Sequence, residues 1–426
     1  MLSIYRFLTF FLYPVFILII FLRVFFKKEN KFRYKEKIFS SSFNPKKSKN
    51  KKLIWFHASS IGELLSIMPL IDNLNINNSK NLEFLVTTVT LSSAELLEKK
   101  LLNYNNVTHR FFPLDTKFLV SSFLNNWQPN LICFIDSEIW PNFLFKIKEN
   151  KIPLILLNAR ITKKTLNRWK VFSKFAKKVF DNFDLCLASS NESKKNLELL
   201  GVKNISYIGN LKFCSKVKFD KINESNKLIL SDFNVWCAAS THKGEEEIII
   251  KAHINLREKI KNLKTIIIPR HITRVSDISS LTIKHNLTSQ ILNDKEDINK
   301  KADIIIVNSF GVLEKYYDYC KNVFVGKSML KKLENVGGQN PIEPAKLGCK
   351  IFHGPYVYNF KEIYEFLNSN DIAIQVHNEQ DLSSKLLESF EAKDISSTRY
   401  IDNLEKYGDK ILTETIGNIK NYINIY

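Results

Sequence analysis

The sequence predicts an α/β protein of two parallel, doubly wound units that follow an N-terminal hydrophobic anchor helix. Three observations predict this class. The chain has 426 residues and is 45% hydrophobic, which is more than one ordinary core needs and indicates two domains. Short apolar runs alternate with segments of helical periodicity, and this alternation occurs in two successive series. An uncharged apolar run stands before both series.

The composition excludes several classes of protein. With 12 Gly and 11 Pro the chain is neither collagen-like nor dominated by linkers, and its apolar fraction excludes a wholly disordered chain. The net charge of +20 predicts attraction to something anionic, such as a membrane, a nucleotide, a nucleic acid or an acidic substrate. Only ten of the 63 basic residues are Arg, a Lys-rich bias that an AT-rich genome imposes, so the charge favours no one of these partners.

The six cysteines lie far apart and form no C-x-x-C pair. Several stand inside apolar runs, which predicts reduced, buried thiols in a cytosolic protein and no zinc site. They are Cys133, Cys186, Cys214, Cys237, Cys320 and Cys349.

The first element is the uncharged apolar run over residues 7–22, which a Lys- and Arg-rich stretch follows. A spanning helix needs about 20 apolar residues, so the run is slightly short, and Pro14 would kink it. No small-residue cleavage site follows, and the basic flank places the body on the cytoplasmic side. We therefore predict an uncleaved anchor over residues 1–28, which either spans the membrane once or lies in its interface. An ordinary core helix is the alternative.

Each series that follows contains six apolar runs typical of buried parallel strands. The first comprises LIWF (53–56), LEFLVTT (82–88), LICFID (131–136), IPLILLN (152–158), LCLAS (185–189) and ISYIG (205–209). The second comprises VWCAAS (235–240), TIIIPR (265–270), DIIIVNS (303–309), NVFVG (322–326), CKIFHG (349–354) and DIAIQVH (371–377).

A polar stretch near residues 214–230 separates the two series. The predicted domains are therefore 40–213 and 225–400, with a C-terminal helix over 401–426 that can pack back on the first. Ligands of such sheets bind at the carboxyl ends of the strands, and the cleft between the two domains is the expected site.

Three motifs in the first domain follow strands. Glu63 in HASSIGE could be a general base with a raised pKa or a capping carboxylate, and the motif favours neither. In DSEIWPN, Asp136 and Glu138 could bind a metal or stabilise a cation, but this motif alone favours a capping role for Glu138 and a core role for Trp140. Lys212 in GNLKF is a surface charge unless the substrate is anionic.

Three more motifs lie in the second domain. ASTHKGE (239–245) has a capping signature and an exposed helix start of the kind that binds anions. Arg270 at a strand end suits a phosphate or an interdomain salt bridge. The turn at Gly337 and Gly338 leaves backbone N–H groups free to bind a phosphate, and Glu343 could accept hydrogen bonds from ribose hydroxyls. A plain turn at a helix start is the alternative. Neither a Walker A loop nor a G-x-G-x-x-G fingerprint occurs.

Seven motifs in this order resemble the Kdo transferases, which move 3-deoxy-D-manno-octulosonic acid (Kdo) from CMP-Kdo onto a lipid A precursor. The similarity runs from about Trp55 to Phe360, and the N-terminal anchor fits it too. The motifs are HASSIGE, SEIWPN, LLNARIT (156–162), IGNLKF, ASTHKGEE, IIIPRH and VGGQNPIEPAKLGCKIFHGP (336–355).

The resemblance implies a GT-B fold, with the acceptor on the first domain and the nucleotide on the second. It also implies lipopolysaccharide inner-core biosynthesis at the inner membrane, with no metal and no cofactor. Glu63 then matches the base, and Glu138 and Lys212 match positions that stabilise the transition state. The positions that match the CMP site are Pro269, Arg270, Gly311, Val312, Leu313, Asn340, Pro341, Ile342 and Glu343.

These implied roles agree with the chemistry of the reaction. The carboxylate of Kdo gives Lys212 a partner, and a nearby carboxylate stabilises the oxocarbenium-like state in a single displacement with inversion. The chain departs from the family at Val312, where an acid is usual, and at Gln339, where His is usual. Both departures concern nucleotide contacts rather than the fold.

Two other interpretations compete with this one. Another GT-B glycosyltransferase, with a different sugar nucleotide or acceptor, would keep Arg270 and Glu343 but need not keep Glu138 together with Lys212. A membrane-tethered module that binds nucleic acid would show steep salt dependence and no turnover. The few Arg residues and the lack of a nucleic-acid motif count against it. We expect CMP-Kdo, a lipid A precursor and inner-membrane lipid as partners, and no nucleic acid.

Overall fold

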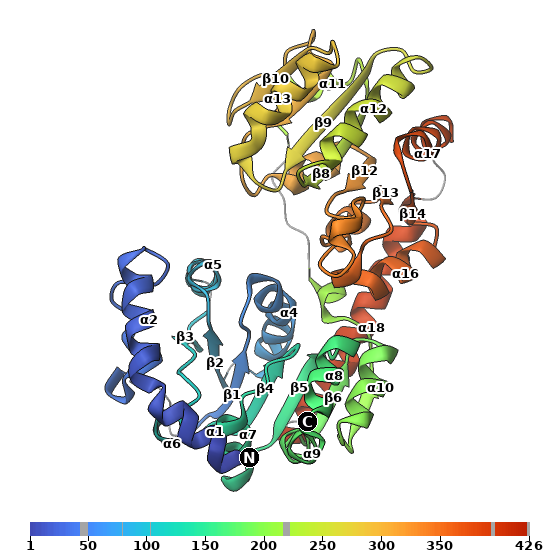
Figure 1. Cartoon of the computed structure of the whole chain (residues 1–426). Helices are drawn as coiled ribbons and strands as arrows, with labels where there is room; N and C mark the ends of the chain where they lie inside the picture. Colours follow the sequence, from blue (N-terminus) through green and yellow to red (C-terminus); the bar gives the residue numbers. More distant parts are fainter. Residues whose placement is uncertain (43–49, 79, 103, 216–221, 393–396, 424–426) are drawn as a thin grey trace. The chain divides into compact units, whose positions relative to one another are not determined.

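The computed structural model describes residues 1–426 apart from 43–49, 79, 103, 216–221, 393–396 and 424–426 (Figure 1). The chain forms two compact units, Met1–Ser215 together with Tyr407–Tyr426, and Lys216–Lys406. Most of the Lys-rich connector before the first strand, and part of the polar stretch at 214–230, lie outside the described residues.

The first unit contains one sheet of seven parallel strands in the order β3-β2-β1-β4-β5-β6-β7. The order reverses between β1 and β4, and this switch point is where open α/β sheets bind ligands. The strands are β1 Lys52–His57, β2 Leu82–Thr88, β3 Val107–Phe111, β4 Leu131–Ile135, β5 Leu154–Ala159, β6 Leu185–Ala188 and β7 Ile205–Tyr207. The helices around them are α4 Ile61–Asn78, α5 Leu91–Leu101, α6 Lys117–Trp127, α7 Pro141–Glu149, α8 Lys163–Lys170, α9 Ser173–Phe180, α10 Asn191–Leu199 and the 3₁₀ turn η2 Leu211–Cys214.

The second unit repeats this plan in the order β10-β11-β9-β8-β12-β13-β14, with the reversal between β8 and β12. Its strands are β8 Asn234–Thr241, β9 Leu263–Pro269, β10 Ser289–Leu292, β11 Ile304–Val307, β12 Asn322–Val325, β13 Lys350–His353 and β14 Ala373–Gln375. Its helices are α11 Glu224–Leu230, α12 Glu245–Arg257, α13 Val275–Lys284, α14 Leu313–Tyr319, α15 Ile342–Lys346, α16 Lys361–Ser369 and α17 Glu379–Glu391.

The predicted class, two parallel α/β sheets, is confirmed. Two strands, β3 and β10, are not among the predicted ones, and both lie at a sheet edge. In β3 buried and partly exposed residues alternate, and three of the four β10 residues are only partly buried. An edge strand that carries polar side chains lacks the continuous apolar run that marks a strand buried on both faces.

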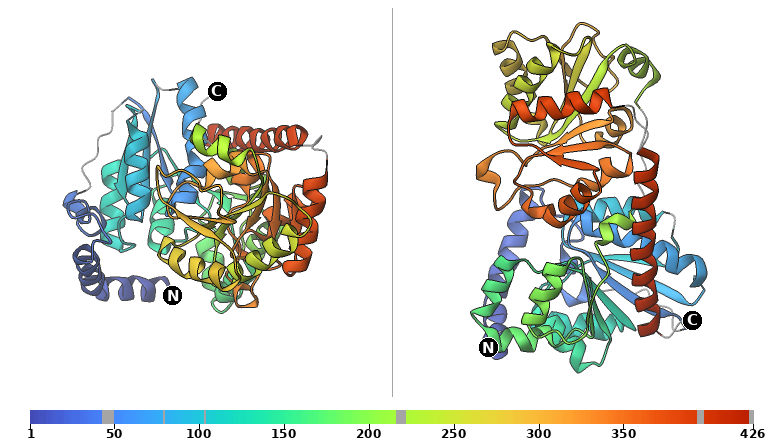
Figure 2. Two further views of the ribbon diagram at one scale, coloured as in Figure 1. Left: turned by 90° about the horizontal axis from the view of Figure 1, so that it is seen from above. Right: turned by 90° about the vertical axis from the view of Figure 1, so that its right-hand side faces the viewer.

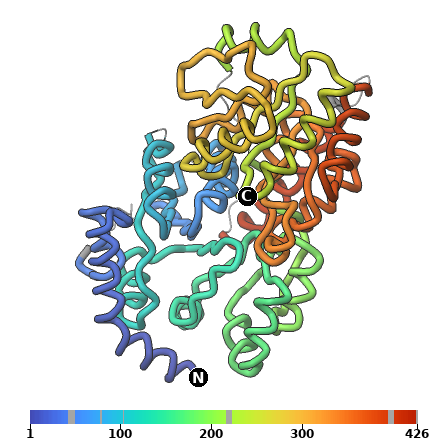
Figure 3. The backbone as a smooth tube through the Cα atoms, turned by 45° about the horizontal axis from the view of Figure 1, so that its top comes forward, coloured from blue at the N-terminus to red at the C-terminus, as the bar shows by residue number. Residues whose placement is uncertain are grey.

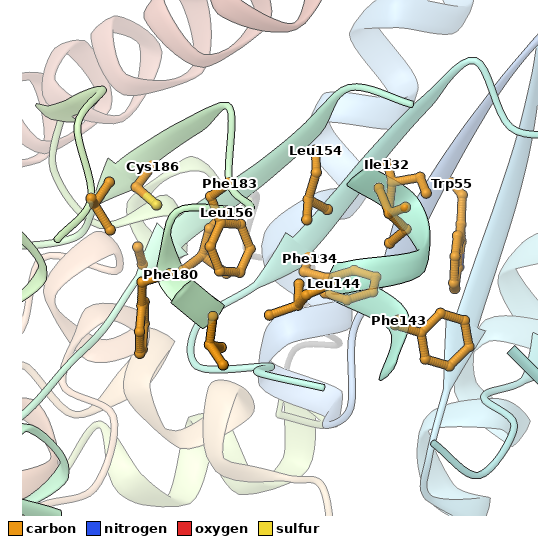
Figure 4. Packing of buried hydrophobic residues seen from close by; sticks show 14 of the residues in the cluster. Trp55, Ile132, Phe134, Phe143, Leu144, Leu154, Leu156, Phe180, Phe183 and Cys186 are labelled. Atoms are coloured by element: carbon orange, nitrogen blue, oxygen red, sulfur yellow. The ribbon is translucent and has the colours of Figure 1, made fainter. Parts of the chain in front are cut away.

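Aromatic and aliphatic side chains pack together in the core of the first unit (Figure 4). The ring of Trp55 in β1 lies 5.5 Å from that of Phe134 in β4 and 5.5 Å from that of Phe143 in α7, and all three are fully buried. Replacing such a side chain by Ala costs roughly 3–5 kcal/mol, because it removes both burial and contacts. This packing fixes the ends of β1 and β4 relative to each other.

The N-terminal apolar run forms two helices, α1 Leu2–Phe11 and α2 Tyr13–Phe25, which meet at an angle of 50° (Figure 3). No described helix is by itself long and apolar enough to cross a membrane, although this bent pair would suffice by length and composition. The single anchor helix of the prediction is therefore not confirmed. Pro14 stands in the first turn of α2, where its missing N–H is tolerated, so the helix breaks just before it. A short helix, α3 Lys35–Ile38, follows.

The last helix, α18 Ser397–Ile423, contributes its final turns to the first unit (Figure 2). The hydroxyl of Tyr422 donates to the carbonyl of Asp184 at 3.1 Å, and Nζ of Lys52 donates to the carbonyl of Ile423 at 2.7 Å. These bonds join the last turns of α18 to the first residue of β1 and to the residue before β6.

Candidate active site

Glu63 lies in the first turn of α4, directly after the carboxyl end of β1. Its Oε2 accepts from the backbone N–H of Ser59 at 2.7 Å, and its Oε1 accepts from the hydroxyl of Ser60 at 2.8 Å. Glu63 thus makes the hydrogen bonds of a capping carboxylate at the start of α4. Burial, and then the charge of Asp136, raise the pKa of Glu63 above its usual value. A carboxyl group with a raised pKa is also suited to take up a proton, so the two interpretations are compatible.

Glu138 lies in the loop after β4, on the other side of the switch point. Its Oε2 accepts from the indole Nε1 of Trp140 at 2.7 Å and lies 3.1 Å from Nε2 of His57. Burial alone would raise the pKa of Glu138, but the hydrogen bonds with His57 and Trp140 outweigh it and hold this pKa below its usual value. The pKa values of the neighbouring Glu63 and Glu138 are therefore shifted in opposite directions. Such a divergence is typical of two carboxyl groups with separate roles in acid–base chemistry.

Asn158 connects the segment that carries Lys212, the third predicted catalytic residue, to the loop after β4. The resemblance includes Asn158 only as part of the motif LLNARIT. Its amide donates to the carboxylate of Asp136, and its Oδ1 accepts from the backbone N–H of Leu211 at 2.9 Å. The turn η2 that carries Lys212 also packs against α4. The structure thus brings Glu63, Glu138 and the segment of Lys212 to one edge of the sheet. An Asn directly before a strand end was the available signal for this link.

In the second unit, Pro269 ends β9 and Arg270 is exposed directly after it. The backbone N–H of Arg270 donates to the carbonyl of Thr241 at 3.1 Å, which fixes the turn to the end of β8. The next arginine, Arg274, instead makes a bidentate ion pair with the buried Glu246, with bonds of 2.7 and 2.9 Å. Of the two arginines, Arg270 is therefore the one that the turn presents to solvent.

The other predicted nucleotide residues form one group. Asn340 donates to Oε1 of Glu343 at 3.1 Å, and its own Oδ1 accepts from the N–H of Ile342 at 3.2 Å, while Pro341 lies buried between them. Burial, and then the charge of Glu314, raise the pKa of Glu343 to about 7.

The second predicted loop lies beside this group. Gly311, with φ +70°, Val312 and Leu313 lead into α14, which packs against α15. Among the described residues no hydrogen bond joins Pro269 or Arg270 to either loop. The structure thus brings two of the three segments that were predicted to bind the nucleotide into contact, through the packing of α14 against α15.

Two expectations for phosphate binding in this unit are wrong. The N–H groups of Gly337 and Gly338 donate to the carbonyls of Leu333 and Lys327, at 2.6 and 2.7 Å, and are not available to a ligand. Gly337 is needed for close packing, since an added Cβ would stand 2.0 Å from the carbonyl oxygen of Tyr356.

The helix start in ASTHKGE also differs from the prediction. Its N-cap is Gly244 rather than a Ser or Thr, and the first turn of α12 contains three glutamates. The carboxylate of Glu245 accepts the backbone N–H groups of Lys327, Ser328 and Met329 at 2.7 to 3.0 Å. The first turn of α12 therefore carries a carboxylate of the protein itself, which the backbone of residues 327–329 binds.

Within the parts of the chain that the structure describes, no group of three His, Cys, Asp or Glu side chains is placed to hold a metal ion. The six cysteines are buried free thiols. Metal-independent chemistry remains a prediction from the resemblance.

Comparison with known proteins gives a consistent picture. The family model of 3-deoxy-D-manno-octulosonic-acid transferase (kdotransferase) matches residues 32–215. A 3-deoxy-D-manno-octulosonic acid transferase of Rickettsia bellii is 31% identical over 390 residues, which covers 91% of this chain and 90% of the relative. The enzyme of that name from Haemophilus influenzae is 28% identical over 377 residues, with coverages of 87% and 86%.

Among solved structures, a putative UDP-N-acetylglucosamine 2-epimerase from Listeria monocytogenes matches 88% of this chain and 97% of its own, with a TM-score of 0.60 and 13% identity. At that identity the likeness concerns the fold alone, and it supports the GT-B part of the predicted class.

Proposed function

Because this chain belongs to the Kdo transferases, a family of glycosyltransferases, we propose that it transfers Kdo from CMP-Kdo to a lipid A precursor by inverting displacement. The observation that supports this mechanism most directly is the pair Glu63 and Glu138. These carboxyl groups lie on opposite sides of one switch point, and their pKa values move in opposite directions. Kdo transfer needs one group that accepts the proton of the attacking hydroxyl and a second group that stays negatively charged near the developing cation.

Glu63 is the general base in this proposal. The acceptor hydroxyl oxygen forms a bond to the anomeric carbon of Kdo, the bond from that carbon to the CMP phosphate breaks, and the hydroxyl proton passes to Glu63. The electron pair of the broken bond leaves with CMP. Burial favours the protonated product form of the base. The hydrogen bonds from Ser59 and Ser60 orient the carboxylate before the acceptor arrives.

Glu138 keeps its negative charge and faces the positive charge that develops at the anomeric carbon. Lys212 on the neighbouring turn η2 pairs with the carboxylate of Kdo. Charges fixed in a partly buried site act more strongly than in water, because less solvent screens them.

The second unit holds the donor in this proposal. Arg270, exposed at the end of β9, binds the phosphate of CMP-Kdo in a bidentate manner. Asn340 and Glu343, together with Gly311 and Val312, contact the nucleoside. Val312 offers only backbone groups at a position where an acidic side chain would add a contact.

The surface of the first unit supports attachment to the cytoplasmic face of the inner membrane. The hydroxyl of Tyr5 donates to Asp115 at 2.7 Å, and Arg6 lies 3.5 Å from Glu149 of α7, so α1 is fastened to the body by its polar side. Its apolar side chains point outward. The large exposed ones of α1 and α2 are Ile4, Phe7, Leu8, Phe10, Phe11, Val15, Leu18, Ile19, Phe21, Leu22 and Phe25.

The helices α8 and α9 extend this surface. Residues 163–180 include seven Lys or Arg residues and no Asp or Glu, and between the two helices Val171 and Phe172 are 73% and 53% exposed. Helix α9 packs against α7, the helix that Arg6 of α1 also contacts. Apolar tips surrounded by basic residues fit a bilayer that contains anionic lipids.

The test of the proposed function is transfer in detergent with CMP-Kdo and a purified lipid A precursor, without added metal and with a chelator, read by mass spectrometry. The expected product is heavier by one Kdo or by several, which also counts the units added. A folded protein that binds CMP but gives no product would contradict this donor–acceptor pair. It would favour another GT-B glycosyltransferase activity with a different donor or acceptor.

A further inference from the structure

A chain of hydrogen bonds runs through the core of the first unit to Glu138. The indole Nε1 of Trp55 donates to Oγ1 of Thr87 at 2.8 Å, and this hydroxyl lies 3.0 Å from Nδ1 of His57. On the other side of the imidazole, Nε2 lies 3.1 Å from Oε2 of Glu138, which also accepts from Trp140 at 2.7 Å. His57 and Thr87 are partners in the register of β1 and β2, so the sheet itself sets this alignment.

The chemistry of the partners determines where the imidazole carries its proton. An indole N–H can only donate, so Thr87 Oγ1 accepts from Trp55 and has its own proton to give. The carboxylate of Glu138 can only accept, so Nε2 of His57 donates to it, and Nδ1 of the neutral ring is then the acceptor for the Thr87 proton. In the neutral ring the remaining proton lies on Nε2 and points at the carboxylate of Glu138. The opposite tautomer would place the Nε2 lone pair against a carboxylate oxygen.

Packing holds the ring in this orientation. His57 is fully buried, and its ring stacks on Phe112 with centroids 3.8 Å apart and an interplanar angle of 18°. The ring of Phe134 in β4 meets it edge-on at 5.4 Å. The groups that face the imidazole are therefore Thr87 of β2, two aromatic rings and Glu138, and of these only Glu138 carries a charge.

We propose that His57 is a positioning residue for the transferase reaction, fixed by Trp55 and Thr87 as the Nε2–H tautomer so that it orients Glu138 and keeps it anionic. The inference rests on the proposed function, because Glu138 is the group that meets the developing cation. His57 itself does not touch the substrate. Two N–H donors on Oε2 leave the carboxylate little freedom to rotate, which matters because misplaced charge loses most of its effect on the transition state.

The sharpest variant is Thr87→Val, which removes the hydroxyl proton and keeps the shape of the side chain. Nδ1 then has only the carbonyl of residue 87, 3.2 Å away in the native protein, and that oxygen attracts a proton. We expect the ring to change to the Nδ1–H tautomer and kcat to fall roughly 10- to 100-fold, with KM for CMP-Kdo changed less than about twofold.

The chain offers a matched control in the next residue of the same strand. The hydroxyl of Thr88 makes an equivalent buried contact of 2.9 Å with Nε2 of His109, away from the candidate site. Thr88→Val therefore loses a similar threonine–histidine bond, and we expect its kcat to remain within about twofold of wild type. His57→Gln, whose amide can still donate to Glu138, should retain more activity than His57→Ala.

The ring tautomer can be observed without turnover, from the ¹⁵N shifts of His57 in the full-length protein. We expect Nε2–H in the wild type and in Thr88→Val, and Nδ1–H in Thr87→Val. A wild-type ring in the Nδ1–H form, or a Thr87→Val enzyme as active as the control, would overturn the proposal. If the wild type transfers no Kdo, the proposed function fails instead, while the ¹⁵N shifts still decide the tautomer.

Discussion

The hydroxyl of Ser60 donates a 2.8 Å hydrogen bond to Oε1 of Glu63, so the carboxylate that we assign as the base also caps the helix that carries it. This arrangement, S-x-x-E at a helix start, satisfies backbone and side-chain donors before any substrate binds. It also pre-orients the base, because the carboxylate is held on the same side of α4 as the end of β1.

The first prediction concerns Glu63→Gln. The amide keeps an acceptor for Ser60 but has no capacity to take up a proton, so kcat should fall about 10²- to 10⁴-fold while CMP-Kdo binding remains. Transfer rates and donor titration calorimetry measure the two effects separately. Glu192→Gln is the control, since Glu192 is an exposed first-turn glutamate of α10 in the same unit. Normal turnover in Glu63→Gln would remove Glu63 as the base.

The second prediction concerns the exposed Arg270. Without its guanidinium the phosphate of the donor loses a charged, bidentate contact worth roughly 1.5–3 kcal/mol, so Arg270→Ala should raise KM for CMP-Kdo by about 10- to 100-fold. Arg257→Ala serves as the comparison, because Arg257 is a partly exposed arginine of the same unit with its own partner, Asp303. Donor kinetics in Arg270→Ala that match those of Arg257→Ala would sink the phosphate role.

The third prediction is a pH dependence from Glu343. Its pKa is raised to about 7 in the folded protein, above the value of 4.5 for the free side chain. The folded state therefore binds the proton more tightly, and this contribution to the free energy of unfolding is lost as the pH rises from about 4.5 through 7. Glu343→Gln abolishes the loss and should stabilise the protein at pH 8, by up to about 3 kcal/mol.

Chemical denaturation at pH 5 and pH 8 measures this effect. The gain in Glu343→Gln should be present at pH 8 and small at pH 5. Glu314→Gln, which removes only the second cause of the shift, should give a smaller gain. Equal stability of Glu343→Gln and wild type at pH 8 would contradict burial as the main cause.

The fourth prediction concerns the membrane surface on α8 and α9. Replacing both Val171 and Phe172 by Asp should reduce binding to vesicles that contain anionic lipid roughly tenfold or more, since it removes apolar burial and adds repulsion. Leu228→Asp is a closely matched control, because Leu228 in the second unit is 73% exposed, the same as Val171. Vesicle binding by the double variant that equals the control would exclude α8 and α9 from the membrane surface.

The fold was predictable where strands are buried on both faces. LICFI, which became β4, has five buried residues in a row, and an apolar run this short between polar segments fits a buried strand better than a helix. The edge strand VTHRF alternates instead, and its polar Thr108, His109 and Arg110 leave no apolar run that would indicate a strand. The bend between α1 and α2 was foreseen at Pro14, but the separation into two helices was not.

The candidate site was predictable only in part. Sequence motifs placed Glu63 and Glu138 after strands, and the sheet order then brought them together. The partners of His57 lie 30 and 81 residues away in the chain, so no local pattern could single it out. The N–H groups of Gly337 and Gly338 were assigned to a ligand because their carbonyl partners become visible only in the tertiary structure.

Helix α18 has a consequence for the order in which the chain is made. Residues 216–406 are contiguous, so the second unit has all its strands when residue 406 leaves the ribosome. The first unit lacks its turns of α18, and the bonds of Tyr422 and Ile423, until residues 407–423 have also been made. Vectorial synthesis therefore completes the later unit before the earlier one, and the first sheet waits with one flank uncovered while the second is translated.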